Sequence, residues 1–153
     1  VANFDVSFDG DTRLNRPVLI EGDNQEEIHK MAMEIHEKSR RFAFLFFDQL
    51  DIDVRKSLNS FKDLGPVTIF VSDISKLQDV EIFTLINYLK NHHCDAGPQI
   101  IGASSVGVEA LKSRQLIPEE LIQLLNGAYI KMNRPFKEYV QQGLDRFFFD
   151  SLN

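Results

Sequence analysis

The sequence predicts an α/β protein, a three-layer αβα sandwich in which helices cover both faces of a mainly parallel five-stranded sheet. Its short apolar runs are continuous rather than alternating, which is typical of strands buried on both faces. Segments with helical periodicity fill the gaps, so strand and helix alternate five times along the chain. The length of 153 residues suits one domain, and residues 1–153 are therefore expected to form a single domain.

The predicted elements follow one another without a linker, repeat or low-complexity segment between them. The predicted strands lie at residues 17–21, 42–47, 67–71, 99–103 and 128–132. The predicted helices lie at residues 25–40, 54–64, 79–92, 106–112 and 118–125. Pro118 suits a first helical turn, where its missing N–H costs nothing. The helix at 79–92 is expected to bury a broad apolar stripe formed by Val80, Phe83, Ile86, Tyr88 and Leu89.

The two ends of the chain differ in character. Residues 1–16 are a polar lead-in or an edge strand, whereas residues 136–153 are expected to form an amphipathic helix. That helix should turn inward Val140, Leu144, Phe147 and Phe148. Only two of Phe147, Phe148 and Phe149 can face one core, so the third could mark a partner surface or contact a following segment. Ordinary core packing of this triplet is the alternative.

Charge and cysteine content exclude several functional classes. Lys and Arg number 17 against 23 Asp and Glu, a net charge of 17 − 23 = −6. This balance argues against direct binding to nucleic acid or to a membrane surface, because both repel negative charge. Cys94 is the single cysteine, so an intramolecular disulfide and a Cys-rich zinc site are excluded. No apolar run approaches the length of a membrane span, and we expect a cytoplasmic protein.

Histidines give no metal site in this interpretation. His92, His93, Cys94 and Asp95 are adjacent residues at a helix end, and such neighbours rarely converge on one ion. His29 and His36 lie seven residues apart on one helix face, about 10 Å along the axis. That separation prevents joint ligation, so both are expected at boundary or surface positions.

The loop after the first predicted strand occupies the place of a phosphate-binding loop. Such a loop needs glycines, whose backbone N–H groups approach the anion, and a lysine that neutralises the outer phosphates. Here the segment consists of Gly22, Asp23, Asn24, Gln25, Glu26, Glu27 and Ile28. It has one glycine, three carboxylates and an isoleucine where the lysine is needed. We therefore expect a cavity mouth ringed by acids and without a cation, which will not hold a triphosphate.

Polar residues also follow two further predicted strands. Asp73 follows the third strand and could hold Mg²⁺, although capping of the next helix is the simpler interpretation. Ser104 and Ser105 end the fourth strand and could cap the helix that follows them.

Three stretches resemble the AAA+ domain of bacterial sigma-54-dependent transcription activators. Residues 17–41 are similar to that family's first strand, phosphate loop and helix, and residues 68–89 to its metal-binding strand and following helix. Residues 99–126 are similar, without a gap, to the segment from the sensor strand to the arginine-finger helix. Pro135 to Glu138 are similar to the exit toward the lid. The resemblance implies a P-loop NTPase-like fold, here without a lid subdomain.

The sequence departs from this family at every position that the reaction needs. The resemblance places the phosphate-loop glycines at Gln25 and Glu27, and the lysine at Ile28. The strand-ending acidic pair falls at Ser72 and Asp73, and the sensor asparagine at Ser105. The finger arginines fall at Pro118 and Leu124. The family's long insertion, which grips sigma-54, is missing between Phe47 and Val67.

These departures imply a degenerate domain that has lost ATP and Mg²⁺ binding and is not an enzyme. Its vestigial site would comprise the loop at residues 22–28 with Asp73 and Ser105. Its role would be regulatory, in bacterial transcription or signal transduction, through contacts with protein partners. Those partners could be copies of itself or related AAA+ subunits.

A receiver-like phosphoacceptor domain is the alternative. Its layout would use an acidic pair at Glu21 and Asp23, with Asp73 as phosphoacceptor, Ser104 as hydroxyl and Lys131 as cation. Against it, Lys131 does not adjoin the following proline, and the chain lengths fit the activator better. An active NTPase is a third class, for which the loop chemistry is wrong.

Overall fold

A computed structural model of the chain describes residues 16–91 and 97–141. Its core is a five-stranded sheet with the strand order β2-β3-β4-β1-β5, in which all four pairings are parallel. The strands are β1 (Val18–Glu21), β2 (Phe44–Phe46), β3 (Thr68–Val71), β4 (Gln99–Ser104) and β5 (Ala128–Lys131). The predicted parallel sheet is confirmed, with each strand within its predicted run or one residue longer.

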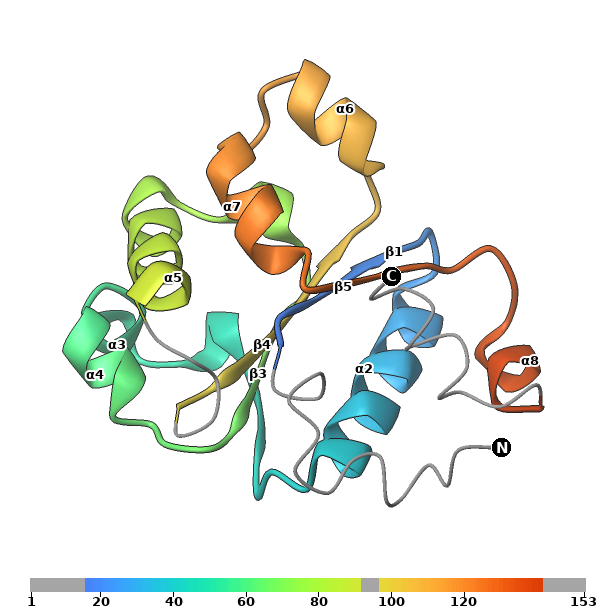
Figure 1. Cartoon of the computed structure of the whole chain (residues 1–153), viewed down its shortest axis with the longest axis horizontal. Coiled ribbons are helices and arrows are strands. Elements are labelled where there is room, and N and C mark those ends of the chain that lie inside the picture. The colour runs from blue at the N-terminus through green and yellow to red at the C-terminus, as the bar shows by residue number, and fades with distance from the viewer. Residues whose placement is uncertain (1–15, 92–96, 142–153) are drawn as a thin grey trace.

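Helices flank the sheet on both sides, which confirms the αβα sandwich (Figure 1). One face packs against α2 (Gln25–Ser39) and α8 (Phe136–Gln141). The other face packs against α3 (Ile52–Arg55), α4 (Leu58–Lys62), α5 (Asp79–Asn91), α6 (Val108–Ser113) and α7 (Glu119–Leu125). Residues 16–91 and 97–141 contain no separate lid subdomain. Within the same residues no helix has the length and apolarity needed to cross a membrane.

Side chains alternate between two cores, which explains why the strands read as continuous apolar runs. Val18 and Ile20 pack toward α2, whereas Leu19 packs toward the opposite helices. All six residues of β4 are buried. Because both faces of the sheet are buried, the strands lack the usual alternation of polar and apolar residues.

The local sequence explains where helix α2 begins and ends and which of its side chains are buried. The side chain of Asn24 accepts a hydrogen bond from the backbone N–H of Glu27 at 3.1 Å, which caps the first turn. Ile28, Met31 and Ile35 are buried, as the periodicity predicts. The helix ends at Arg40, which adopts a left-handed conformation with φ of 61°.

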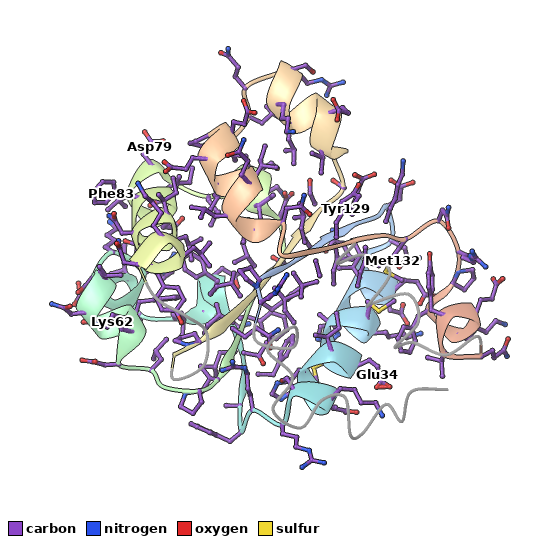
Figure 2. The ribbon with its side chains drawn as sticks, viewed as in Figure 1. Glu34, Lys62, Asp79, Phe83, Tyr129 and Met132 are labelled. Atoms are coloured by element: carbon purple, nitrogen blue, oxygen red, sulfur yellow. The ribbon has the colours of Figure 1, made fainter. Side chains whose placement is uncertain are left out.

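The predicted apolar stripe on α5 is partly wrong. Phe83 is 67% exposed and Val80 36% exposed, and Phe83 projects from the outer side of the helix (Figure 2). The buried face instead includes Glu81, whose carboxylate pairs with Arg55 of α3 at 2.7 Å. A buried ion pair turns a charged residue inward, and apolar periodicity cannot reveal such a rotation.

The interpretation of the C-terminal helix needs a similar correction. Val140 is 46% exposed, and Tyr139 is the buried residue of α8. The hydroxyl of Tyr139 accepts from the backbone N–H of Asn133 at 3.1 Å, so a polar anchor sets the face of this helix. Residues 142–153, with Leu144 and the Phe147, Phe148 and Phe149 triplet, lie outside the described residues, as do residues 1–15.

Two boundary predictions are also corrected. The helix expected at 54–64 is two short helices, α3 and α4, because Ser57 caps a new start by accepting from the N–H of Ser60. Pro118 precedes α7 as its N-cap rather than lying in its first turn.

The strand order excludes the receiver-like alternative. That fold has the order 2-1-3-4-5, which places its first and third strands side by side. Here β4 lies between β1 and β3. The end of β1 at Glu21 and the residue after β3, Asp73, are therefore not on adjacent strands, and the receiver layout is wrong.

His36 lies where α2 packs on the edge of the sheet. Its Nδ1 is 2.7 Å from the hydroxyl oxygen of the fully buried Thr68, and its ring meets Phe44 edge-on at 5.4 Å. Burial lowers the pKa of His36, with Glu37 opposing and Arg41 reinforcing the shift. His29 contacts Phe44, Phe46 and Phe70. Both histidines are half-buried, as expected of boundary positions.

We predict that His36 makes folding stability fall with acidification. The folded state prefers the neutral ring, whereas the unfolded histidine binds a proton near its ordinary pKa of 6.5. This contribution is therefore present above that value and is lost as the pH falls below it toward the lower folded pKa. Urea unfolding from about pH 7.5 to 5.5 should show a steeper loss for the native chain than for His36→Gln, in which all other groups titrate equally. Parallel curves would contradict the prediction.

Candidate functional site

The loop predicted as the degenerate phosphate site borders an open cavity at the carboxyl end of the sheet. The cavity has a volume of about 250 Å³. From the loop it is lined by Gly22, Asp23, Asn24, Glu27 and Ile28, and from the segment between β5 and α8 by Met132, Asn133, Arg134 and Pro135. The carboxyl ends of parallel strands are where ligands of open α/β sheets bind.

Hydrogen bonds within the chain occupy several of the loop's polar groups. The carboxylate of Glu27 accepts from the backbone N–H of Phe136 at 3.1 Å, so it holds the start of α8. The N–H of Gly22 donates to the carbonyl of Ser104 at 3.0 Å. A Cβ at Gly22 would lie 3.3 Å from Cβ of Met132, so the loop and the β5–α8 segment meet closely here.

Two other loop residues point elsewhere. Glu26 has a side chain that is 79% exposed and pairs with Lys30 at 3.5 Å. Neither Glu26 nor its neighbour Gln25 lines the cavity. Of the three acidic residues of the loop, Asp23 and Glu27 therefore line this space, and Glu26 does not.

Arg134 corrects the prediction that the cavity lacks a cation. It lines the cavity opposite the loop, and its guanidinium carbon lies 5.5 Å from the centre of the Tyr139 ring. The family resemblance directed attention to Ile28, the position of the missing lysine. Arg134 lies about a hundred residues after the loop, so the sequence of the loop itself did not indicate this cation.

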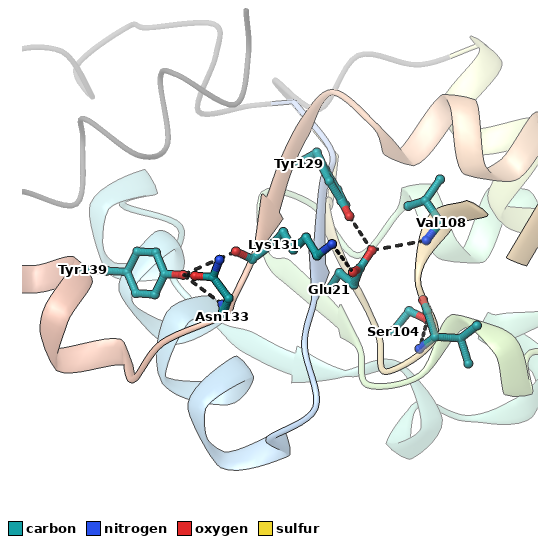
Figure 3. Close-up of polar contacts among 8 residues, drawn as sticks. Glu21, Ser104, Val108, Tyr129, Lys131, Asn133 and Tyr139 are labelled. Carbon is teal, nitrogen blue, oxygen red and sulfur yellow. Dashed lines mark hydrogen bonds and ion pairs between the residues drawn. The ribbon is translucent and has the colours of Figure 1, made fainter. Parts of the chain in front are cut away.

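Glu21 is a functional candidate that the main sequence interpretation missed (Figure 3). Its carboxylate accepts from the backbone N–H of Val108 at 3.2 Å and from the hydroxyl of Tyr129. It also lies 3.8 Å from Nζ of Lys131, and its side chain is only 13% exposed. One carboxylate thus joins the end of β1 to the start of α6 and to β5.

Tyr129 responds to this environment. Burial, the hydrogen bond to Glu21 and that carboxylate's charge all raise the pKa of Tyr129 well above its usual value of 10. The tyrosine is therefore a permanent donor at physiological pH. In the sequence, the acidic residue Glu21 at the end of an otherwise apolar strand was the feature that could have indicated this cluster.

Asp73 lies apart from the loop, in a second cavity of about 210 Å³ that is also lined by Arg55 and Glu81. Its carboxylate accepts from the backbone N–H and hydroxyl of Ser75 at 3.0 and 2.6 Å. This is the capping role that was the simpler interpretation, here for a short 3-10 helix at Ile74–Lys76.

The two serines differ in exposure. Ser104 is buried, and its hydroxyl accepts from the N–H of Val106 at 3.0 Å. Ser105 is exposed and lines neither the loop cavity nor the Asp73 cavity. The structure therefore does not bring Asp73 and Ser105 into the loop cavity.

No group of three or more metal-ligating side chains occurs within residues 16–91 and 97–141. The run from His92 to Asp95 lies outside these residues, so its predicted lack of a metal stays a prediction.

The fold has solved counterparts, although no family model and no curated protein matches the sequence. One is NtrX from Brucella abortus in complex with ATP, with a TM-score of 0.58 and 12% identity. Another is the same protein in complex with ADP, with a TM-score of 0.59 and 11% identity. Each similarity covers 97% of this chain and 40% of NtrX. The chain thus shares the fold of the AAA+ domain of a sigma-54 activator.

We predict that the Glu21–Tyr129 contact stabilises the sheet. Tyr129→Phe should lower the free energy of unfolding by about 1–2 kcal/mol, because a hydrogen bond to a charged acceptor is lost. Urea unfolding of this variant, of Glu21→Gln and of the double variant forms a cycle that isolates the pair. Strictly additive effects would show that the two side chains do not cooperate.

Proposed function

We propose that the chain is a non-catalytic, AAA+-like regulatory domain of a bacterial transcription regulator or signalling protein, which acts through protein contacts. The observation that carries this proposal is the loop at residues 22–28, whose charged residues in the cavity lining are Asp23 and Glu27 and whose Glu27 binds the chain's own backbone. The shared fold supports the regulatory class.

Electrostatics argue against a bound triphosphate. At about 4 Å, like charges repel by about 1 kcal/mol even in bulk water, and by more where water is scarce. Asp23 and Glu27 both line the cavity, and Arg134 in the same lining supplies one opposing charge. Ile28, in the place of the family's lysine, is 0% exposed and packs in the core.

The groups that would perform hydrolysis are also unsuited. Asp73 is hydrogen-bonded to Ser75 and lines a different cavity from the loop. Pro118, in the place of a finger arginine, is the N-cap of α7. A proline side chain carries no charge with which to stabilise phosphoryl transfer.

Nucleotide binding is the direct test. We predict no heat on titration of ATP with Mg²⁺ into the protein by calorimetry, and no phosphate release, because the acidic loop repels the polyanion. Asp23→Asn, which removes one inward charge without changing shape, is the variant most prone to gain weak binding. A micromolar affinity of the native chain for Mg²⁺–ATP would refute the loss of nucleotide binding.

We further predict that Ile28→Lys does not restore ATPase activity. The lysine would enter a fully buried position, so the variant should lose about 2–4 kcal/mol of stability. Asp73, Ser105 and Pro118 would remain unsuited to the reaction. Ile28→Met, which keeps an apolar side chain, is the matched control for folding. Turnover by the folded Ile28→Lys variant above that of Ile28→Met would overturn the pseudoenzyme interpretation.

A further inference from the structure

Helix α6 is held to the rest of the molecule by little apolar contact. Its one buried residue is Leu111, whereas the neighbouring α7 buries Leu121, Ile122 and Leu125. Residues 112–116, which end α6 and lead toward α7, are all exposed. In Figure 1, α6 projects beyond α7 at the top of the view. Few buried apolar contacts are typical of a segment with low local stability.

A cavity of about 490 Å³ lies between the far end of α6 and the start of α5. Gln115, which follows α6, has a left-handed backbone with φ of 53°, an uncommon conformation for a residue other than glycine. The end of α6 therefore lacks close packing against α5. The cavity lining includes Lys112, Gln115 and Leu116 on the side of α6 and Leu77, Asp79 and Ile82 around the start of α5.

The start of α6 is fixed by a carboxylate from another element. Gly107, the N-cap of α6, has no side chain that could cap the helix. The carboxylate of Glu21, at the end of β1, accepts instead from the backbone N–H of Val108 at 3.2 Å (Figure 3). Among the described residues, this is the one hydrogen bond that joins residues 105–116 to a distant part of the chain. Hydrogen bonds to a charged acceptor are stronger than those between neutral groups.

Glu21 itself belongs to the sheet. Tyr129 and Lys131 contact the same carboxylate from β5, and the Glu21 side chain is only 13% exposed. The acceptor of this hydrogen bond is therefore fixed on a rigid element, whereas its donor lies on a weakly packed one.

From these contacts we infer that residues 105–116 form a flap that opens as a unit while the sheet stays folded, and that the hydrogen bond from Val108 to Glu21 holds it closed. Opening uncovers Leu111 and the lining of the adjoining cavity. The hydrogen bond thus controls access to this part of the core. The inference does not depend on the function proposed above.

Native-state hydrogen exchange, measured by mass spectrometry at constant pH, tests the flap. We expect peptides spanning residues 108–116 to exchange through local opening, faster than those of α7 and β4. Glu21→Gln should raise the exchange of residues 108–116 roughly tenfold, because an amide is a weaker acceptor than a carboxylate. Tyr129→Phe is the matched control. It removes a different contact of Glu21 and lowers global stability, but it should leave the exchange of the flap unchanged.

A second pair of variants removes the donor instead of the acceptor. Val108→Pro deletes the N–H at the first position of a helix, where proline is tolerated. Gly107 has φ of −62° and ψ of 152°, angles that suit a residue before proline. Val108→Ala keeps the N–H and shortens the same side chain, so it is the matched control. We expect residues 109–116 to exchange faster in Val108→Pro than in Val108→Ala.

Three outcomes would overturn the inference. If residues 108–116 of the native chain exchange as slowly as α7 and β4, no flap opens separately. If Tyr129→Phe speeds their exchange as much as Glu21→Gln does, their exchange follows global unfolding. If neither Glu21→Gln nor Val108→Pro exceeds its control, this hydrogen bond does not hold the flap. Nucleotide titration has no part in these measurements, so the proposed loss of ATP binding is judged separately.

Discussion

Burial of both faces of a parallel sheet is the constraint on which this structure depends. Such a sheet requires helices on each side. Because its strands are parallel, the carboxyl ends of all five lie at the same end of the sheet. Polar groups that the cores exclude collect there, and each must find a hydrogen-bonding partner. Glu21 at the end of β1 and Ser104 at the end of β4 satisfy this requirement through neighbouring backbone N–H groups.

Two carboxylates near the carboxyl ends of the strands contribute to folding. Glu27 accepts the first N–H of α8, and Glu21 accepts from α6 and β5. In a nucleotide-binding protein, an anionic ligand at this edge can connect such segments. In this chain, the carboxylates of Glu27 and Glu21 make such connections between segments.

The sequence predicted the sheet well because apolar runs report burial directly. It failed where a polar contact decides which way an element faces. Glu81 is buried because Arg55 pairs with it, which turns Phe83 outward. Tyr139 is buried because its hydroxyl binds near Asn133, which turns Val140 outward. In the site, the loop residues were identifiable by position, whereas Arg134 and Tyr129 come from distant segments that only the fold brings near.

An open sheet also has two edge strands, and within the sheet each of them pairs with another strand on one side only. Proteins usually protect such edges with charge or shortness. Here the two edges use different means, a lysine at β5 and a length of three residues at β2. A charged side chain and a short strand each make an edge a poorer template for a further strand.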